Sequence, residues 1–170
     1  MKKVLLALVL FISVLSTESF AQKAKFGHIN SNDLLVAMPE RAEAQKKLQE
    51  FSKQLEDQLA VMNQEFQTKY QDYVAHQDSL SNSIKQLKEE ELQSLQQRIQ
   101  NFQQTAQQDL QKKEQELLQP IIDKAKNAIK EVAKEKGYTW VFDTSVGSLV
   151  VWPENSDNLL NDVKAKLGIK

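Results

Sequence analysis

The stretch that determines the fold is residues 40–134, ERAEAQKKLQEFSKQLEDQLAVMNQEFQTKYQDYVAHQDSLSNSIKQLKEEELQSLQQRIQNFQQTAQQDLQKKEQELLQPIIDKAKNAIKEVAK. It contains no glycine, and its single proline, Pro120, lies near its end. Gln, Glu, Lys and Leu dominate it, and all four favour helices. A helix of this length cannot be buried within a chain of 170 residues. It must fold back on itself and project from a small body, so we expect most of the protein to be an arm rather than an active site.

Apolar side chains recur every three or four residues along this stretch, which is the spacing of a coiled coil. In the first half the apolar positions are Leu48, Phe51, Leu55, Leu59, Met62, Phe66, Tyr70, Tyr73, Leu80 and Ile84. Gln77 occupies the position of the pattern between the last tyrosine and Leu80. In the second half, which Lys113 interrupts, they are Leu87, Leu92, Leu95, Ile99, Phe102, Ala106, Leu110, Leu117, Ile121, Ala125, Ala128 and Val132.

Residues 78–83, DSLSNS, which are polar except for Leu80, lie between the two series near the midpoint of the stretch. Such side chains hydrogen-bond to their own backbone and compete with the helix. We therefore predict a hairpin with a first helix over 40–78, a tight turn near 81–83 and a returning helix. Each limb of about 40 residues would reach about 60 Å, whereas the alternative, one continuous rod, would reach about 140 Å.

The N-terminal end of the predicted body holds one strand and one short helical turn. Residues 25–30, KFGHIN, alternate as a strand does, and residues 31–33, SND, can cap the helical turn at 34–38. Pro39 then suits the first turn of the long helix.

At the other end, Gly137 is expected to end the long helix, since glycine is favoured just past a helix end. Residues 138–143 and 148–152 are rich in aromatic and β-branched side chains and predict two strands, with a turn at 144–147. Residues 155–166 predict a short amphipathic helix capped by Ser156 or Asp157.

The expected fold is therefore α+β, with a long antiparallel helical hairpin inserted in a small β-body. We assign the body to residues 22–39 and 121–170 and the arm to residues 40–120. Pro120 removes a helical hydrogen bond, so it is a candidate hinge between them.

Such a body is small for its apolar content and would bury too little surface alone. Pairing between subunits would cover the apolar side chains, so we predict a homo-oligomer joined through the bodies. The residues expected in the body core or the oligomer interface are Phe26, Ile29, Trp140, Phe142, Val151 and Trp152.

Residues 1–21 have the pattern of a secretory signal peptide. Lys2 and Lys3 precede an apolar run, and cleavage is expected after Ala21. An uncleaved N-terminal anchor is the alternative. The chain has no cysteine, which excludes disulfides and thiolate metal sites.

Charge and motifs argue against nucleic-acid binding and catalysis. The chain has 22 basic and 23 acidic residues. Removal of the signal peptide takes away Lys2, Lys3 and Glu18, which leaves 20 basic and 22 acidic residues. The mature chain therefore has no surplus of basic residues for binding nucleic acid. No phosphate-binding glycine loop or metalloprotease motif is present. His28 and His76 are interpreted as structural and solvated residues, and Asp143 as a turn former. We expect no catalytic residue, metal site or cofactor.

Several short motifs occur in an order that resembles a known family. The motifs are the signal peptide, KFGHINS at 25–31, LL at 34–35, MPE at 38–40, LLQPII at 117–122, AKEKGY at 133–138 and VFD at 141–143. The motifs lie on both sides of a long charged hairpin. Together they resemble the Skp (OmpH-like) family of periplasmic chaperones across essentially the whole mature chain.

The resemblance implies a jellyfish-shaped trimer in which three hairpins hang from a shared β-body around a cavity. It also implies a periplasmic holdase that needs no ATP and protects unfolded outer-membrane β-barrel proteins from aggregation. Some of the arm's apolar residues would then contact the client, although the same residues could hold the hairpin together. The candidates are Leu59, Met62, Phe66, Tyr70, Tyr73, Leu95, Ile99 and Phe102.

The charge of the arm tip departs from the family, whose tips can be strongly basic. Residues 70–99 hold three basic and five acidic side chains, so direct contact with a membrane is left open. The runner-up function is an envelope coiled-coil adaptor that binds one folded partner. A hydrolase with a carboxylate pair lacks any motif, and the signal peptide argues against a cytosolic prefoldin-like chaperone.

Overall fold

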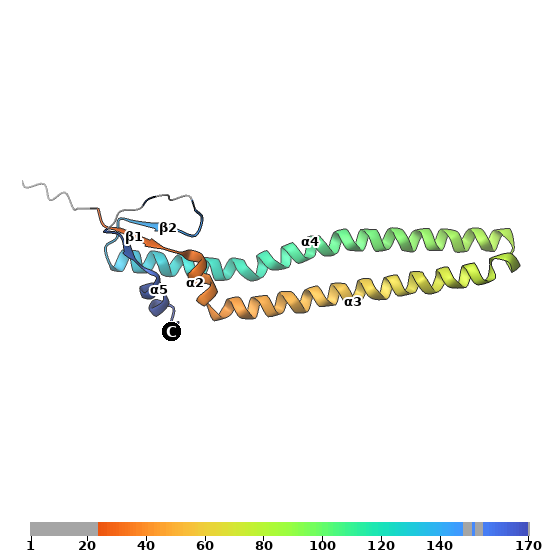
Figure 1. Ribbon diagram of the computed structural model, residues 1–170, viewed down its shortest axis with the longest axis horizontal. Helices are drawn as coiled ribbons and strands as arrows, with labels where there is room; N and C mark the ends of the chain where they lie inside the picture. Colours follow the sequence, from red (N-terminus) through yellow and green to blue (C-terminus); the bar gives the residue numbers. More distant parts are fainter. Residues whose placement is uncertain (1–23, 148–150, 152–154, 170) are drawn as a thin grey trace, which may run out of the picture.

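The computed structural model describes residues 24–147, 151 and 155–169. A long hairpin of two helices projects from a small body that holds a sheet and two short helices (Figure 1). The predicted signal peptide and most of the strand predicted at 148–152 lie outside the described residues. Val151, the described residue of that segment, is not in a strand.

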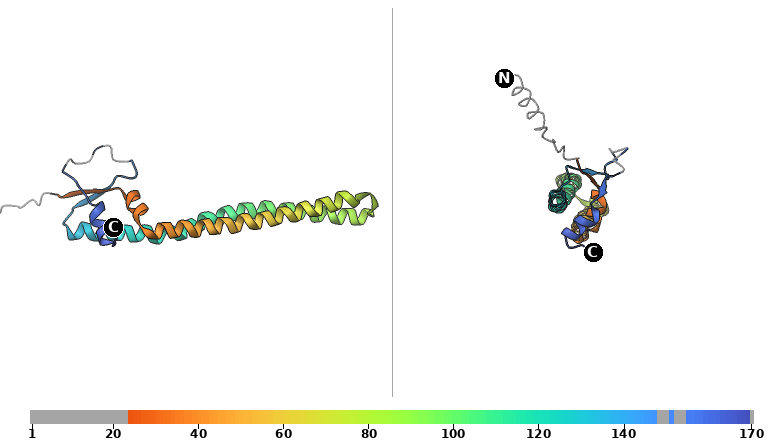
Figure 2. Two further views of the ribbon diagram at one scale, coloured as in Figure 1. Left: turned by 60° about the horizontal axis from the view of Figure 1, so that its bottom comes forward. Right: turned by 90° about the vertical axis from the view of Figure 1, so that its left-hand side faces the viewer.

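The hairpin consists of α3 (Pro39–His76), the 3-10 turn η1 (Gln77–Ser79) and α4 (Asn82–Glu135). Both views in which the arm lies horizontal show α3 and α4 side by side along its length (Figures 1 and 2). The predicted hairpin is therefore confirmed and the continuous rod is wrong.

The turn at the tip lies earlier than predicted, at residues 77–81 rather than 81–83. Ser79 Oγ donates to the carbonyl of His76 at 2.8 Å. Ser81 is the N-cap of α4, and its Oγ accepts from the Ile84 N–H at 3.4 Å. Because Ser81 caps the helix, residues 82 and 83 already belong to the first turn of α4.

The sheet contains β1 (Phe26–Ile29), β2 (Trp140–Asp143) and β3 (Asp157–Asn158) in the order β2-β1-β3. Both pairings are parallel. Parallel strands need a crossover connection, and here the segment from α2 to α4, arm included, is the crossover from β1 to β2. The first two strands were predicted, with slightly longer bounds. β3 was not, because residues 157–158 were assigned to the last helix.

Two short helices flank the sheet, and both caps differ from the prediction. α2 (Ser31–Ala37) is capped by Asn30, whose Oδ1 accepts from the N–H groups of residues 32 and 33 at 3.0 and 3.2 Å. α5 (Leu160–Lys166) is preceded by Asn158, whose Oδ1 accepts from the Leu160 N–H at 2.9 Å. The capping roles suggested for residues 31–33, 156 and 157 are therefore wrong.

One apolar core joins the base of α4 to α2, β1 and α5. Its buried members are Ile29, Leu34, Met38, Ala44, Ile121, Ala125, Ala128, Val132, Leu159 and Val163. Three of these buried residues, Ala44, Ala125 and Ala128, are alanines. The core includes Ala44, and Leu117 packs against it, so body packing extends past the boundary predicted at Pro120.

α4 continues without interruption through Pro120 and ends where predicted, before Gly137, which adopts a left-handed φ of 70°. Figure 1 shows that α4 changes direction between its cyan base and its green outer part. The role of Pro120 as a hinge stays a prediction.

Gly27 is required by a close approach in the body. A Cβ at this position would lie 2.4 Å from Cδ1 of Leu159 and 3.2 Å from the Tyr138 ring. Leu159 is fully buried in the core and cannot move aside without disturbing it. We therefore predict that Gly27→Ala lowers the free energy of unfolding by about 1–3 kcal/mol.

Urea unfolding followed by circular dichroism at one fixed protein concentration measures this change. Val61→Ala, on an exposed face of α3, is the control and should alter stability by less than about 0.5 kcal/mol. Equal stability of Gly27→Ala and the control would contradict the close packing of β1 on Leu159.

Candidate functional site

The middle of the arm is closed by an apolar contact between α3 and α4, which we call the inner cluster. Met62, Leu95 and Ile99 are buried in it, and Leu59, Phe66 and Phe102 pack around them. These six residues were candidates for client contact. In the structure Met62, Leu95 and Ile99 are buried between the two helices of the hairpin, and their contact with a client stays a prediction. Leu59, Phe66 and Phe102 are partly buried in the same contact.

Tyr70 and Tyr73, the other two candidates, lie farther out. Tyr70 is about half exposed and stacks on Phe66, with ring centroids 6.2 Å apart. Tyr73 lies between the helices and donates its hydroxyl hydrogen to Glu89, and this hydrogen bond raises the pKa of Tyr73. Tyr70 therefore keeps an accessible aromatic face, whereas Tyr73 helps to join the two helices.

Three further apolar residues of the outer arm are exposed: Val74, Ile84 and Leu87. Sequence reasoning placed Ile84 and Leu87 in the contact between the helices and did not single out Val74. In the structure the contact on α3 runs through Phe66, Lys69 and Tyr73, so Tyr70 lies beside it rather than in it. Of the apolar positions predicted for the outer arm, Tyr73, Leu80 and Leu92 are half-buried, whereas Tyr70, Ile84 and Leu87 are exposed.

The six residues predicted for the body core or interface fall into different environments. Ile29 is buried in the core. Phe26 and Phe142 are half-buried and stack with centroids 6.2 Å apart. Trp140 is 60% exposed and Val151 is 81% exposed, so neither belongs to the core of the single chain. Trp152 lies outside the described residues.

A groove of about 270 Å³ lies between α2, the base of α4 and the ends of β1 and β2. Its wall is mostly apolar, with Leu35, Ile122 and Ile129 among the lining residues. Asp143 at its rim accepts from Ser31 N at 3.2 Å, Ser31 Oγ at 2.6 Å and Ser145 N at 2.9 Å. Burial raises the pKa of Asp143, but these hydrogen bonds outweigh it and hold the pKa below its usual value. Asp143 therefore ties the end of β2 to the start of α2.

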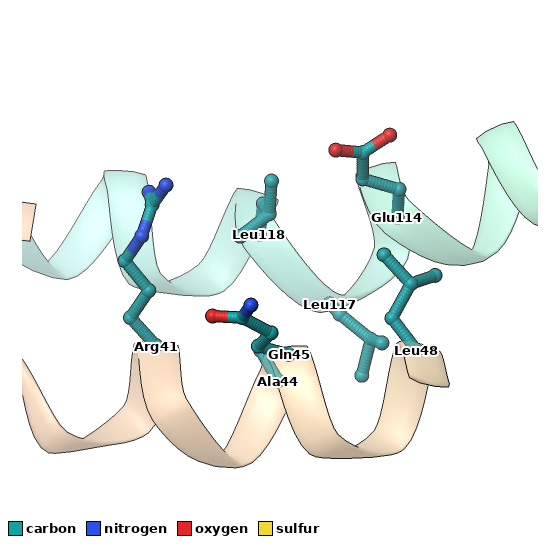
Figure 3. A pocket seen from close by; sticks show the side chains of 7 residues that line it. All are labelled: Arg41, Ala44, Gln45, Leu48, Glu114, Leu117 and Leu118. Atoms are coloured by element: carbon teal, nitrogen blue, oxygen red, sulfur yellow. The ribbon is translucent and has the colours of Figure 1, made fainter. Parts of the chain in front are cut away.

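A second pocket, of about 240 Å³, lies between α3 and α4 at the base of the arm (Figure 3). Arg41, Gln45 and Glu114 lie around it, and the leucines Leu48, Leu117 and Leu118 line it. These charged and amide side chains come from two helices and have no nucleophile among them.

In residues 24–147, 151 and 155–169, no group of three His, Cys, Asp or Glu residues could hold a metal ion. His28 Nδ1 lies 2.6 Å from Ser156 Oγ and links β1 to the segment before β3. Within the same described ranges, no helix is both long and apolar enough to cross a membrane.

The fold thus defines a class of protein in which a helical arm is inserted as the crossover of a small parallel sheet. The chain matches the family model described as Outer membrane protein (OmpH-like) over residues 25–167, and it belongs to this family. Comparison with curated proteins found no match. Membership confirms the resemblance seen in the motifs and is consistent with a periplasmic chaperone of outer-membrane proteins.

Two leucines of α4 form a matched pair that tests the placement of the inner cluster. Leu95 is 2% exposed and Leu87 is 61% exposed. We predict that Leu95→Ala destabilises the protein by about 2–5 kcal/mol, because it leaves a cavity. Leu87→Ala should cost less than about 0.5 kcal/mol.

Thermal and urea unfolding of both variants at equal concentration measures the difference. Similar effects of the two substitutions would show that the helices do not meet as described.

Proposed function

We propose that this protein is a periplasmic holdase chaperone that binds unfolded outer-membrane β-barrel proteins without ATP and prevents their aggregation. The observation that carries the proposal is an arm that projects from the body and keeps apolar side chains exposed near its tip, in a chain of the OmpH-like family. Unfolded β-barrel strands expose apolar faces and unpaired edges, which makes them prone to aggregate.

The proposed contacts with the client are revised by the packing of the hairpin. The accessible apolar side chains of the outer arm are Tyr70, Val74, Ile84 and Leu87. Each would contribute a weak contact, and several arms around one client would give adequate binding together. Acidic and basic residues are interspersed along the arm, which suits clients of varied charge.

We propose that three copies join through their bodies, so that the arms surround a shared cavity. Two features of the described body support self-association. Trp140, Val146 and Val151 are exposed apolar side chains, and such residues gathered on one small body favour an interface. Among the strands of the described residues, β2 lies at an edge of the sheet in the order β2-β1-β3, and an edge strand can pair with another chain.

Suppression of aggregation tests this function directly. The purified protein is added to a urea-denatured β-barrel protein, which is then diluted from urea while light scattering is recorded. We predict suppression at stoichiometric ratio without nucleotide. No suppression at any ratio, together with saturable binding to a folded envelope protein, would instead support the adaptor function.

The contact residues are tested in the same assay. Val74→Ser combined with Leu87→Ser should weaken client binding about two- to tenfold, because the apolar area available to the client is lost. The matched control is Gln71→Ser with Gln93→Ser, which changes two exposed polar residues of the same part of the arm. Equal weakening by the control pair would contradict the assignment of these contacts.

A further inference from the structure

The contact between α3 and α4 changes character along the arm. The inner cluster ends at Phe66 on α3 and Leu95 on α4. Beyond it lies the outer section, residues 67–92, in which no residue is buried. Its half-buried positions are Lys69, Tyr73, Gln77, Leu80, Lys85, Lys88 and Leu92. Five of these seven side chains are polar or aromatic with a polar end, so little apolar surface closes this section.

Polar contacts between the two helices replace the apolar ones. Lys69 pairs with Glu91, and Tyr73 donates to Glu89. Lys88 Nζ lies 2.8 Å from Asp72 Oδ2. The side chains of the Lys88–Asp72 pair are 32% and 50% exposed, so water and salt reach both partners.

Both carboxylates of these pairs are charged at neutral pH. Lys88, through its hydrogen bond, lowers the pKa of Asp72, and Lys69 lowers the pKa of Glu91 in the same way. His76 Nδ1 lies 3.1 Å from the other oxygen of Asp72. The outer section is therefore joined by ion pairs whose strength depends on ionic strength.

Apolar packing does not compensate for the weakness of these pairs. The larger apolar residues of the outer section are exposed, apart from its two half-buried leucines. The exposed ones are Tyr70, Val74, Ile84 and Leu87. Exposed ion pairs contribute little to stability and are screened by salt. A helix end that loses its partner is only marginally stable in water. Local opening of the outer section should then need much less free energy than opening of the inner cluster.

We propose that the outer section is an ionic latch. It opens and closes independently of the inner cluster, by separation of the end of α3 from the start of α4, and ionic strength controls the equilibrium. Opening widens the end of the arm and leaves its base closed. This property belongs to the hairpin itself and holds whether or not the protein is a chaperone.

Hydrogen–deuterium exchange of the full-length mature chain tests the latch. Amides of residues 68–76 and 86–92 report on the outer section, and amides of residues 55–66 and 95–102 report on the inner cluster. Raising NaCl from 50 mM to 1 M should accelerate exchange in the outer section about threefold to tenfold and leave the inner cluster unchanged. Equal acceleration in both parts, or none in either, would overturn the proposal.

Two aspartates of α3 supply a matched pair of variants. Asp72→Asn removes the pair with Lys88 across the hairpin, whereas Asp57→Asn removes the pair with Lys53, which lies within α3. Asp72→Asn should accelerate exchange of the outer section at 50 mM NaCl and reduce its response to salt, and Asp57→Asn should do neither. Identical behaviour of the two variants would overturn the latch.

Replacing two lysines of this contact by leucine should keep the outer section closed. Lys69→Leu combined with Lys88→Leu places apolar side chains at two half-buried positions of the contact. This variant should exchange more slowly in the outer section and lose its salt response. Retention of the full salt response would show that these ion pairs do not control the opening.

Discussion

The packing of the base of α4 against the rest of the body is the contact on which the whole structure depends. Ile121, Ala125, Ala128 and Val132 form one face of α4, spaced so that they meet β1, α2 and α5. The same helix continues outward and supplies Leu95 and Ile99 to the inner cluster of the arm. Because one helix belongs to both parts, the contact that folds the body also fixes where the arm leaves it.

The parallel sheet gives the arm its place in the chain. β1 and β2 pair residue by residue from Phe26 with Trp140 to Ile29 with Asp143. A parallel pair cannot be joined by a tight turn, so the chain must leave the sheet and return. Here the crossover has been extended into a hairpin whose length the body does not constrain. The arm can therefore be held loosely at its tip, by ion pairs, without loss of the body's packing.

Much of this fold could be predicted from the sequence because strong local signals mark it. The glycine-free stretch, the polar break at its middle and Gly137 at its end indicated the hairpin and its limits. β3 could not be found, since two polar residues carry no strand pattern and pair only because β1 lies beside them. The predicted contact face of the outer arm was only partly right, since Tyr73, Leu80 and Leu92 are half-buried but other predicted positions are exposed. Apolar periodicity placed Ile84 and Leu87 between the helices, whereas both are exposed and Lys69 and Lys88 pair across the hairpin instead. Burial of Met62, Leu95 and Ile99 likewise depends on the partner helix, which a single helix pattern does not specify.

The mass of the mature chain in solution, measured by multi-angle light scattering, tests most directly whether bodies join to place several arms around one cavity. We expect three times the mass of the monomer. We also expect that Trp140→Asp, at an exposed position of β2, lowers this mass to that of a folded monomer with unchanged helix content. A monomeric wild-type chain would contradict the shared cavity. A Trp140→Asp variant that keeps the trimer mass would contradict the placement of the interface.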